Sequence, residues 1–125
     1  MTVSNSWTAL AETLKNLSQL LPGQTDASGE ADLYYRRARL AAAEERFDVA
    51  LVFCGKAIEV APRHLAARLL AARIHDKGLN DLEAAVAGYK KVIALAAYDG
   101  SNPLCVAARE ALDALVQKVQ AAVQV

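Results

Sequence analysis

The chain contains few of the residues from which catalytic and metal-binding sites are built. Its 125 residues include two histidines and two cysteines, and the sequence has no phosphate-loop, zinc-protease or Cys–His motif. His64 and His75 fall near opposite ends of one predicted helix, about three turns apart, so they cannot share a metal ion. His64 is expected to cap that helix. We therefore expect no enzyme, with no catalytic residue, no metal site and no cofactor.

The two cysteines and the hydropathy pattern indicate a cytoplasmic protein. Cys54 and Cys105 match no metal or redox spacing and lie among apolar residues, so buried free thiols are expected, with a disulfide between them as the alternative. No apolar run approaches the roughly 18–20 residues that span a membrane. The N-terminus lacks the basic and apolar regions of a signal peptide. No membrane partner is expected.

The charge balance argues against a nucleic-acid partner. The formal net charge is zero, and aromatic residues are not interleaved with the basic ones. A basic face for nucleic acid is the alternative interpretation of six arginines, which are Arg36, Arg37, Arg39, Arg63, Arg68 and Arg73.

The alanine-rich composition predicts closely packed helices. Hydrophobic residues make up 54% of the chain and charged residues 22%, which is typical of a globular protein, and the length fits a single domain, 1–125. Alanine is the best helix former and lets two helices approach closely. With six glycines and three prolines, turn signals are too few for a β-sheet protein. We expect an all-α fold.

An amphipathic helix is predicted at residues 7–21. Its large apolar residues are spaced three and four apart and form one stripe, made of Trp7, Leu10, Leu14, Leu17 and Leu21. Residues 22–30, which begin with Pro22-Gly23, are predicted to form a linker. A linker of that length allows the helix to cap the rest of the protein or to engage another chain. The cap is favoured, because soluble proteins rarely expose such stripes.

From residue 31 the sequence repeats, which predicts two helix–turn–helix units, 31–62 and 63–97. Ala38 and Arg39 recur at an offset of 34, whereas residues of the second helix recur at an offset of 35, as in Ala50/Ala85, Lys56/Lys91, Ile58/Ile93 and Ala61/Ala96. One residue is therefore inserted in the second unit, and a turn near residues 78–81 is its expected place. Helices are expected at about 31–44, 47–60, 64–77 and 82–97, the last with a capping box of Asn80 and Glu83.

A last helix is predicted at residues 102–123. Asn102 is its expected N-cap, and Pro103 stands at the first helical position, where its missing N–H is not needed. The helix has a broad apolar face, made of Leu104, Ala108, Ala111, Leu112, Leu115, Val119 and Ala122. We expect this face to cap the second unit, whose apolar side would otherwise contact water.

The 34-residue helix–turn–helix period resembles the tetratricopeptide-repeat (TPR) family. In the first unit the matching residues are the large aromatic of the first helix, the small residues at the helix crossings and the closing proline, namely Tyr34, Ala38, Ala50, Ala57 and Pro62. The second unit departs at Arg68 and Ala97, and Arg37 replaces the usual leucine of the first. The resemblance implies a right-handed α–α superhelix of two TPR-like repeats, flanked by an N-terminal helix and a C-terminal capping helix.

The resemblance also implies a groove that binds another protein, since the first helices of successive TPR repeats line a concave surface that holds a partner segment. Carried onto this sequence, the groove residues are Asp32, Tyr35, Arg39, Leu69, Arg73 and Lys77, and Ala42, Ala66 and Asp76 are further positions that face the groove. Arg39 and Arg73 then lie one repeat apart, where their rigid guanidinium groups can bind carboxylates. The alternative is that both arginines are solvated or paired with neighbouring acidic residues such as Asp32 or Asp76.

The expected function is therefore that of an adaptor, assembly factor or small chaperone that binds a segment of another protein. The alternative is a self-assembling structural subunit, in which the N-terminal and C-terminal helices join copies of the chain into a homo-oligomer.

Overall fold

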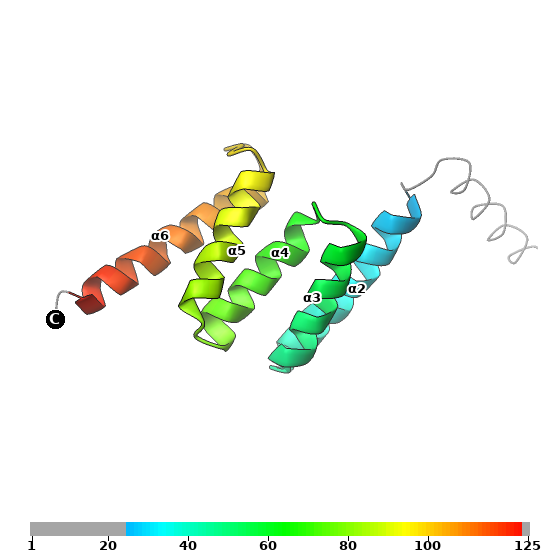
Figure 1. Cartoon of the computed structure of the whole chain (residues 1–125), viewed down its shortest axis with the longest axis horizontal. Coiled ribbons are helices and arrows are strands. Elements are labelled where there is room, and N and C mark those ends of the chain that lie inside the picture. Colours follow the sequence, from blue (N-terminus) through cyan, green and yellow to red (C-terminus); the bar gives the residue numbers. More distant parts are fainter. Residues whose placement is uncertain (1–24, 124–125) are drawn as a thin grey trace, which may run out of the picture.

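The computed structural model of the chain describes residues 25–123, and within this range it is all helical, as predicted. The helices are α2 (Thr25–Ala43), α3 (Phe47–Val60), α4 (Leu65–Arg73), α5 (Leu82–Leu95) and α6 (Pro103–Val123), and α4 continues into a π-helical turn, η1 (Ile74–Gly78). They pack in sequential pairs, α2 with α3 and α4 with α5, and α6 lies on α5 (Figure 1). The predicted helix 7–21 lies outside the described residues. No described helix is both long and apolar enough to cross a membrane.

Most helix bounds agree with the prediction, but α2 does not. It begins at Thr25, six residues before the predicted start at 31, so residues 25–30 are helical although the predicted linker 22–30 includes them. Helix α3 has the predicted bounds, and α5 ends two residues early, at Leu95. Helix α6 begins as predicted, because the backbone N–H of Leu104 donates to Oδ1 of Asn102 at 2.9 Å.

The two turns inside the repeats have the same form. Three residues connect the paired helices in each unit, and the middle residue has a left-handed backbone, Glu45 with φ 60° and Asn80 with φ 54°. The predicted capping box at Asn80 is wrong, since Asn80 forms the turn and the following residue caps the helix. Oδ1 of Asp81 accepts a hydrogen bond from the backbone N–H of Ala84 at 3.1 Å.

The inserted residue of the second unit lies in the π-helical turn and not in the predicted turn near 78–81. Because the turns of both units contain three residues, the extra residue must precede them, at the end of α4. There the backbone N–H of Leu79 donates to the carbonyl of Ile74, five residues earlier, at 2.9 Å. A π-helical turn accommodates one extra residue without interrupting the helix, and this one directs Asp76 toward α5.

The core is made mainly of small side chains at the helix crossings. Ala38, Ala50, Ala57, Ala72 and Ala85 are completely or almost completely buried. At the crossing of α4 and α5 the backbones approach so closely that a Cβ added at Gly88 would lie 2.8 Å from Cβ of Ala72. Because the side chains at the crossings are small, the packing contacts between these helices come mainly from the close approach of their backbones. Cys54 and Cys105 are buried and free, as expected.

Candidate binding groove

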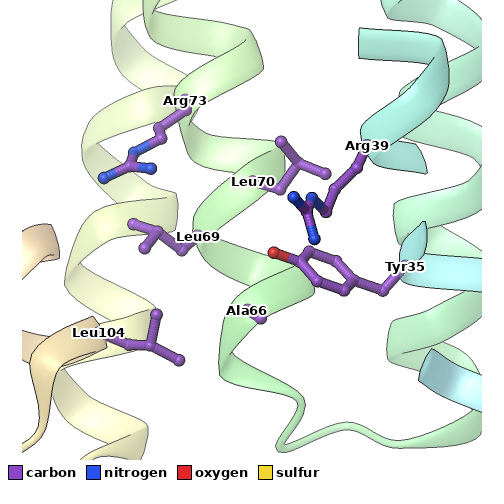
Figure 2. Close-up of a pocket in the computed structure, with 7 residues that line it drawn as sticks. All are labelled: Tyr35, Arg39, Ala66, Leu69, Leu70, Arg73 and Leu104. Atoms are coloured by element: carbon purple, nitrogen blue, oxygen red, sulfur yellow. The ribbon is translucent and has the colours of Figure 1, made fainter. Parts of the chain in front are cut away.

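A cavity of about 380 Å³ lies between α2 and α4 and reaches the beginning of α6 (Figure 2). Five of its seven lining residues are apolar or aromatic, and the other two are arginines from different helices. The lining residues are Tyr35 and Arg39 from α2, Ala66, Leu69, Leu70 and Arg73 from α4, and Leu104 from α6. We call this cavity the groove.

Four of the six predicted groove residues line this cavity together, namely Tyr35, Arg39, Leu69 and Arg73. On each helix the two residues are four positions apart, so they lie on one face of it. The two pairs are related by the 34-residue repeat, and the stacking of the helix pairs therefore brings equivalent faces of α2 and α4 to the same cavity.

The other two predicted residues lie elsewhere. Oδ1 of Asp32 lies 2.8 Å from Nε2 of His64, at the beginning of α4, and Asp32 is not part of the groove lining. Lys77 lines a separate hollow of about 110 Å³ between η1 and α6. The π-helical turn explains the second difference, because it alters the direction of the residues that follow Arg73.

Neither arginine of the groove forms an ion pair with Asp32 or Asp76, the acidic residues named above as possible partners. Among residues 29–123 the ion pairs are Arg46–Glu44 and His64–Asp32, so neither Arg39 nor Arg73 has a carboxylate within 4.0 Å there. Both arginines are exposed, and the guanidinium of Arg39 lies 5.7 Å from the centre of the Tyr35 ring, which is a cation–π distance. The groove thus presents two positive charges beside apolar surface.

The neighbouring Asp76 has another partner. Its Oδ2 accepts a hydrogen bond from the hydroxyl of Tyr89 at 2.9 Å, and both side chains are buried. Burial of the phenol raises the pKa of Tyr89 well above its ordinary value, and the hydrogen bond and negative charge of Asp76 raise it further. Asp76 therefore joins η1 to α5 and is not a partner of the groove arginines in this structure.

His64 connects the beginning of α4 to α2 next to the groove. Its Nδ1 accepts a hydrogen bond from the backbone N–H of Ala67 at 3.1 Å, which confirms the expected N-cap of α4. An acceptor at Nδ1 places the ring proton on Nε2, which donates to Asp32 on α2. The imidazole also lies 5.3 Å, centre to centre, from the ring of Tyr35. His64 therefore fixes the beginning of α4 against the face of α2 that carries Tyr35.

Two lining residues, Leu70 and Leu104, were not among the predicted groove residues. Leu104 was expected only on the capping face of the last helix. Its second contact depends on the angle at which α6 crosses α4 and α5, and the apolar spacing within one helix carries no information about that angle. Leu70 lies one position beyond Leu69, at the edge between the groove and the core that α4 shares with α3.

The described lining of the groove combines apolar side chains with a tyrosine and two arginines. No described lining residue is a serine, cysteine, histidine or carboxylate, so the groove offers no nucleophile with an adjacent base. Within residues 25–123, no three His, Cys, Asp or Glu side chains are grouped to hold a metal ion. Burial raises the pKa of Cys54 to about 11, so this thiol is far from the state in which cysteines react.

Two of the six arginines considered for a basic face are engaged elsewhere. Arg63 donates from Nη2 to the carbonyl of Leu95 at 2.9 Å, and Arg68 donates from Nε to the carbonyl of Pro62 at 2.7 Å. Both bonds satisfy carbonyls at or near helix ends. These bonds fix the directions of the Arg63 and Arg68 side chains, which are exposed and half-buried respectively.

Comparison of the chain with protein-family models, with curated proteins and with solved structures finds no match.

Proposed function

We propose that this chain is a non-catalytic protein-interaction module of TPR type, which holds a segment of another protein in the groove between α2 and α4. It would act as an adaptor, an assembly factor or a small chaperone. The observation that carries the proposal is the position of Arg39 and Arg73, which line one cavity together with apolar side chains and have no carboxylate partner among the described residues.

The TPR assignment rests on the repeat and on the packing that accompanies it. Two helix pairs follow each other at the spacing of the repeat, and the alanines at the predicted crossings are buried. We infer that the two units begin a right-handed superhelix with α6 as its cap, because stacked helix pairs of one repeat type rotate in a constant sense.

The chemistry of the groove indicates what the partner segment contains. An arginine binds a carboxylate through two parallel N–H donors, and hydrogen bonds to charged groups contribute about 1.5–3 kcal/mol when they are shielded from water. Leu70 and Leu104 are half-buried and offer apolar surface near the arginines, whereas Leu69 is almost completely buried beside them (Figure 2). The segment is therefore expected to carry acidic side chains together with at least one apolar side chain.

An affinity pull-down from a lysate of the native organism tests this proposal. The baits are the wild-type chain, Arg39→Glu/Arg73→Glu, and the matched control Arg37→Glu/Arg109→Glu, which makes the same charge change at exposed arginines outside the groove lining. We expect wild type and the control to hold the same protein and the groove variant to lose it. Circular dichroism establishes that all three baits are folded.

Retention of that protein by the groove variant would contradict the proposal and direct attention to the other faces of the stack. Equal loss from the groove variant and the control would also contradict it, because binding would then depend on overall positive charge.

A self-assembling subunit is the second candidate, and one observation favours it. All described residues of α6 after Leu115 are exposed, and this end of the helix projects beyond α5 (Figure 1). Its apolar residues Val116, Val119 and Val123 lie on one side of the helix without a described partner. Light scattering separates the two candidates, because a monomer at micromolar concentration contradicts self-assembly.

A further inference from the structure

The outer face of α2 exposes apolar residues that no described helix covers. Leu33 is 41% exposed and Leu40 is 67% exposed, and since they are seven positions apart they lie on one face of the helix. Among the described helices, α2 packs mainly on α3, with a smaller contact to α4. Soluble proteins seldom leave such a stripe in water, so another segment is expected to cover it.

A hollow beside Leu40 marks where a large side chain fits. Its volume is about 350 Å³, and its described lining comes from α2 alone, from Arg36, Arg39, Leu40 and Ala43. Two guanidinium groups at the edge of an apolar hollow suit an aromatic side chain, because the ring face attracts cations and its body fills apolar space.

The beginning of α2 determines which segment lies nearest. Because α2 starts at Thr25, three residues remain between it and the predicted helix 7–21, and two of the three are Pro22 and Gly23. Connections of two to five residues join helices that pack antiparallel as a hairpin. With α2 beginning at Thr25, the predicted connection is three residues long instead of nine, and a connection of that length favours a hairpin.

The apolar positions of the two segments match in an antiparallel register. Trp7 and Leu40 are equidistant from the midpoint between Gly23 and Gln24, and so are Leu14 and Leu33. A hairpin in this register would place Trp7 and Leu14, two of the five large apolar residues of the predicted helix, opposite the two exposed leucines of α2, with Trp7 beside the hollow.

We infer that residues 7–21 form a helix that covers the outer face of α2 in the same molecule, with Trp7 in the hollow beside Arg36 and Arg39 and Leu14 against Leu33. Arg39 lines both this hollow and the groove, so the covering segment also fixes one of the two groove arginines.

Tryptophan fluorescence tests this inference directly, because Trp7 is the only tryptophan of the chain. The full-length wild type is expected to emit at shorter wavelength than the chain unfolded in denaturant, and to resist quenching by acrylamide. Leu40→Glu is expected to shift the emission toward that of the unfolded chain and to increase quenching several-fold. The control is Val52→Glu on α3, where the valine is also exposed, at 57%, and the spectrum is expected to stay unchanged. Emission of the folded wild type at the unfolded wavelength would overturn the inference.

A disulfide tests the register independently of any effect on folding. Leu14→Cys/Leu33→Cys is expected to form an intramolecular disulfide under mild oxidation, whereas the mismatched pair Leu14→Cys/Ala43→Cys is expected to stay reduced. Cross-linked dimers in place of the intramolecular bond, or a Trp7 emission that changes on dilution, would assign the face to the segment of a second copy and overturn the intramolecular arrangement. Mass spectrometry of the digested protein identifies the linked cysteines and separates them from the buried Cys54 and Cys105.

Discussion

At the scale of single residues, Tyr89 and Asp76 form the buried polar contact of the core. Asp76 is placed by the π-helical turn, and Tyr89 is fully buried in α5, so their hydrogen bond joins the two helices of the second repeat. The phenol must be neutral to donate to the carboxylate. Ionisation would place two negative charges side by side in a buried position, which explains why the pKa of Tyr89 is raised.

We predict that this contact makes stability fall at alkaline pH. A raised pKa in the folded state means that the stabilisation is complete below the ordinary tyrosine value of 10.0 and is lost as pH rises above it. Tyr89→Phe is expected to be less stable at neutral pH by about 1–3 kcal/mol, because Asp76 loses its donor, and to decline less above pH 10. Urea unfolding of both proteins between neutral pH and about pH 11 measures how the difference in their free energies of unfolding changes with pH.

Ionisation of the buried Cys54 thiol, whose pKa is raised to about 11, also lowers the stability of the protein in this pH range. Both proteins contain Cys54, so its contribution cancels when their stabilities are compared. Parallel stability curves for wild type and Tyr89→Phe would contradict the assignment of the alkaline loss to Tyr89.

Residue roles that depend on local sequence were predictable, and roles that depend on a distant partner were not. Asn102 and His64 cap helices as expected, because a cap bonds to backbone two or three residues away. Asp32 was expected in the groove but binds His64, which is 32 positions away in sequence. Only the packing of α2 on α4 brings these two side chains together.

At the scale of helices, the crossing of α4 and α5 depends on Gly88. We predict that Gly88→Ala destabilises the protein, since the new Cβ meets Ala72 at 2.8 Å and neither atom can rotate away. Overpacking costs about 1–3 kcal/mol, and the better helix propensity of alanine returns at most about 1 kcal/mol. The shift of the urea midpoint at constant slope measures the net change.

Gly55 in α3 provides the matched control. It lies in the middle of a helix with nothing within 4 Å of an added Cβ, so Gly55→Ala is expected to stabilise the protein by about 0.5–1 kcal/mol. A stabilising effect at both positions would contradict the close approach of α4 and α5.

The existence of each described helix was predictable, but the position of the inserted residue was not. The change of offset from 34 to 35 indicated one extra residue, and the Gly78–Asp81 segment had the composition of a turn. The helix absorbed the residue as a π-helical turn, in which Asp76 gains the hydroxyl of Tyr89 as its partner. Turn composition alone does not report such a contact between helices.

At the scale of the molecule, the sequence repeat accounts for the order of the helix pairs, and five of the seven residues that line the groove were predicted from it and from the TPR resemblance. Leu70 and Leu104 were not predicted as lining residues, because their exposure depends on the angles between α4, α5 and α6 (Figure 2). The early start of α2 was missed because residues 25–30 contain glycine and serine, which favour loops in isolation, and yet they continue the helix.

The central claim is that the groove binds a peptide segment through Arg39 and Arg73. It is tested most directly by selecting a displayed library of random peptides on wild type and on Arg39→Glu/Arg73→Glu, with Arg37→Glu/Arg109→Glu as the control. We predict that wild type and the control enrich peptides with acidic and apolar residues, and that the groove variant binds these at least about tenfold more weakly, as expected for the loss of one or two charge-assisted hydrogen bonds. Equal affinity of the groove variant for the selected peptides, or selection of peptides without acidic residues, would contradict the account.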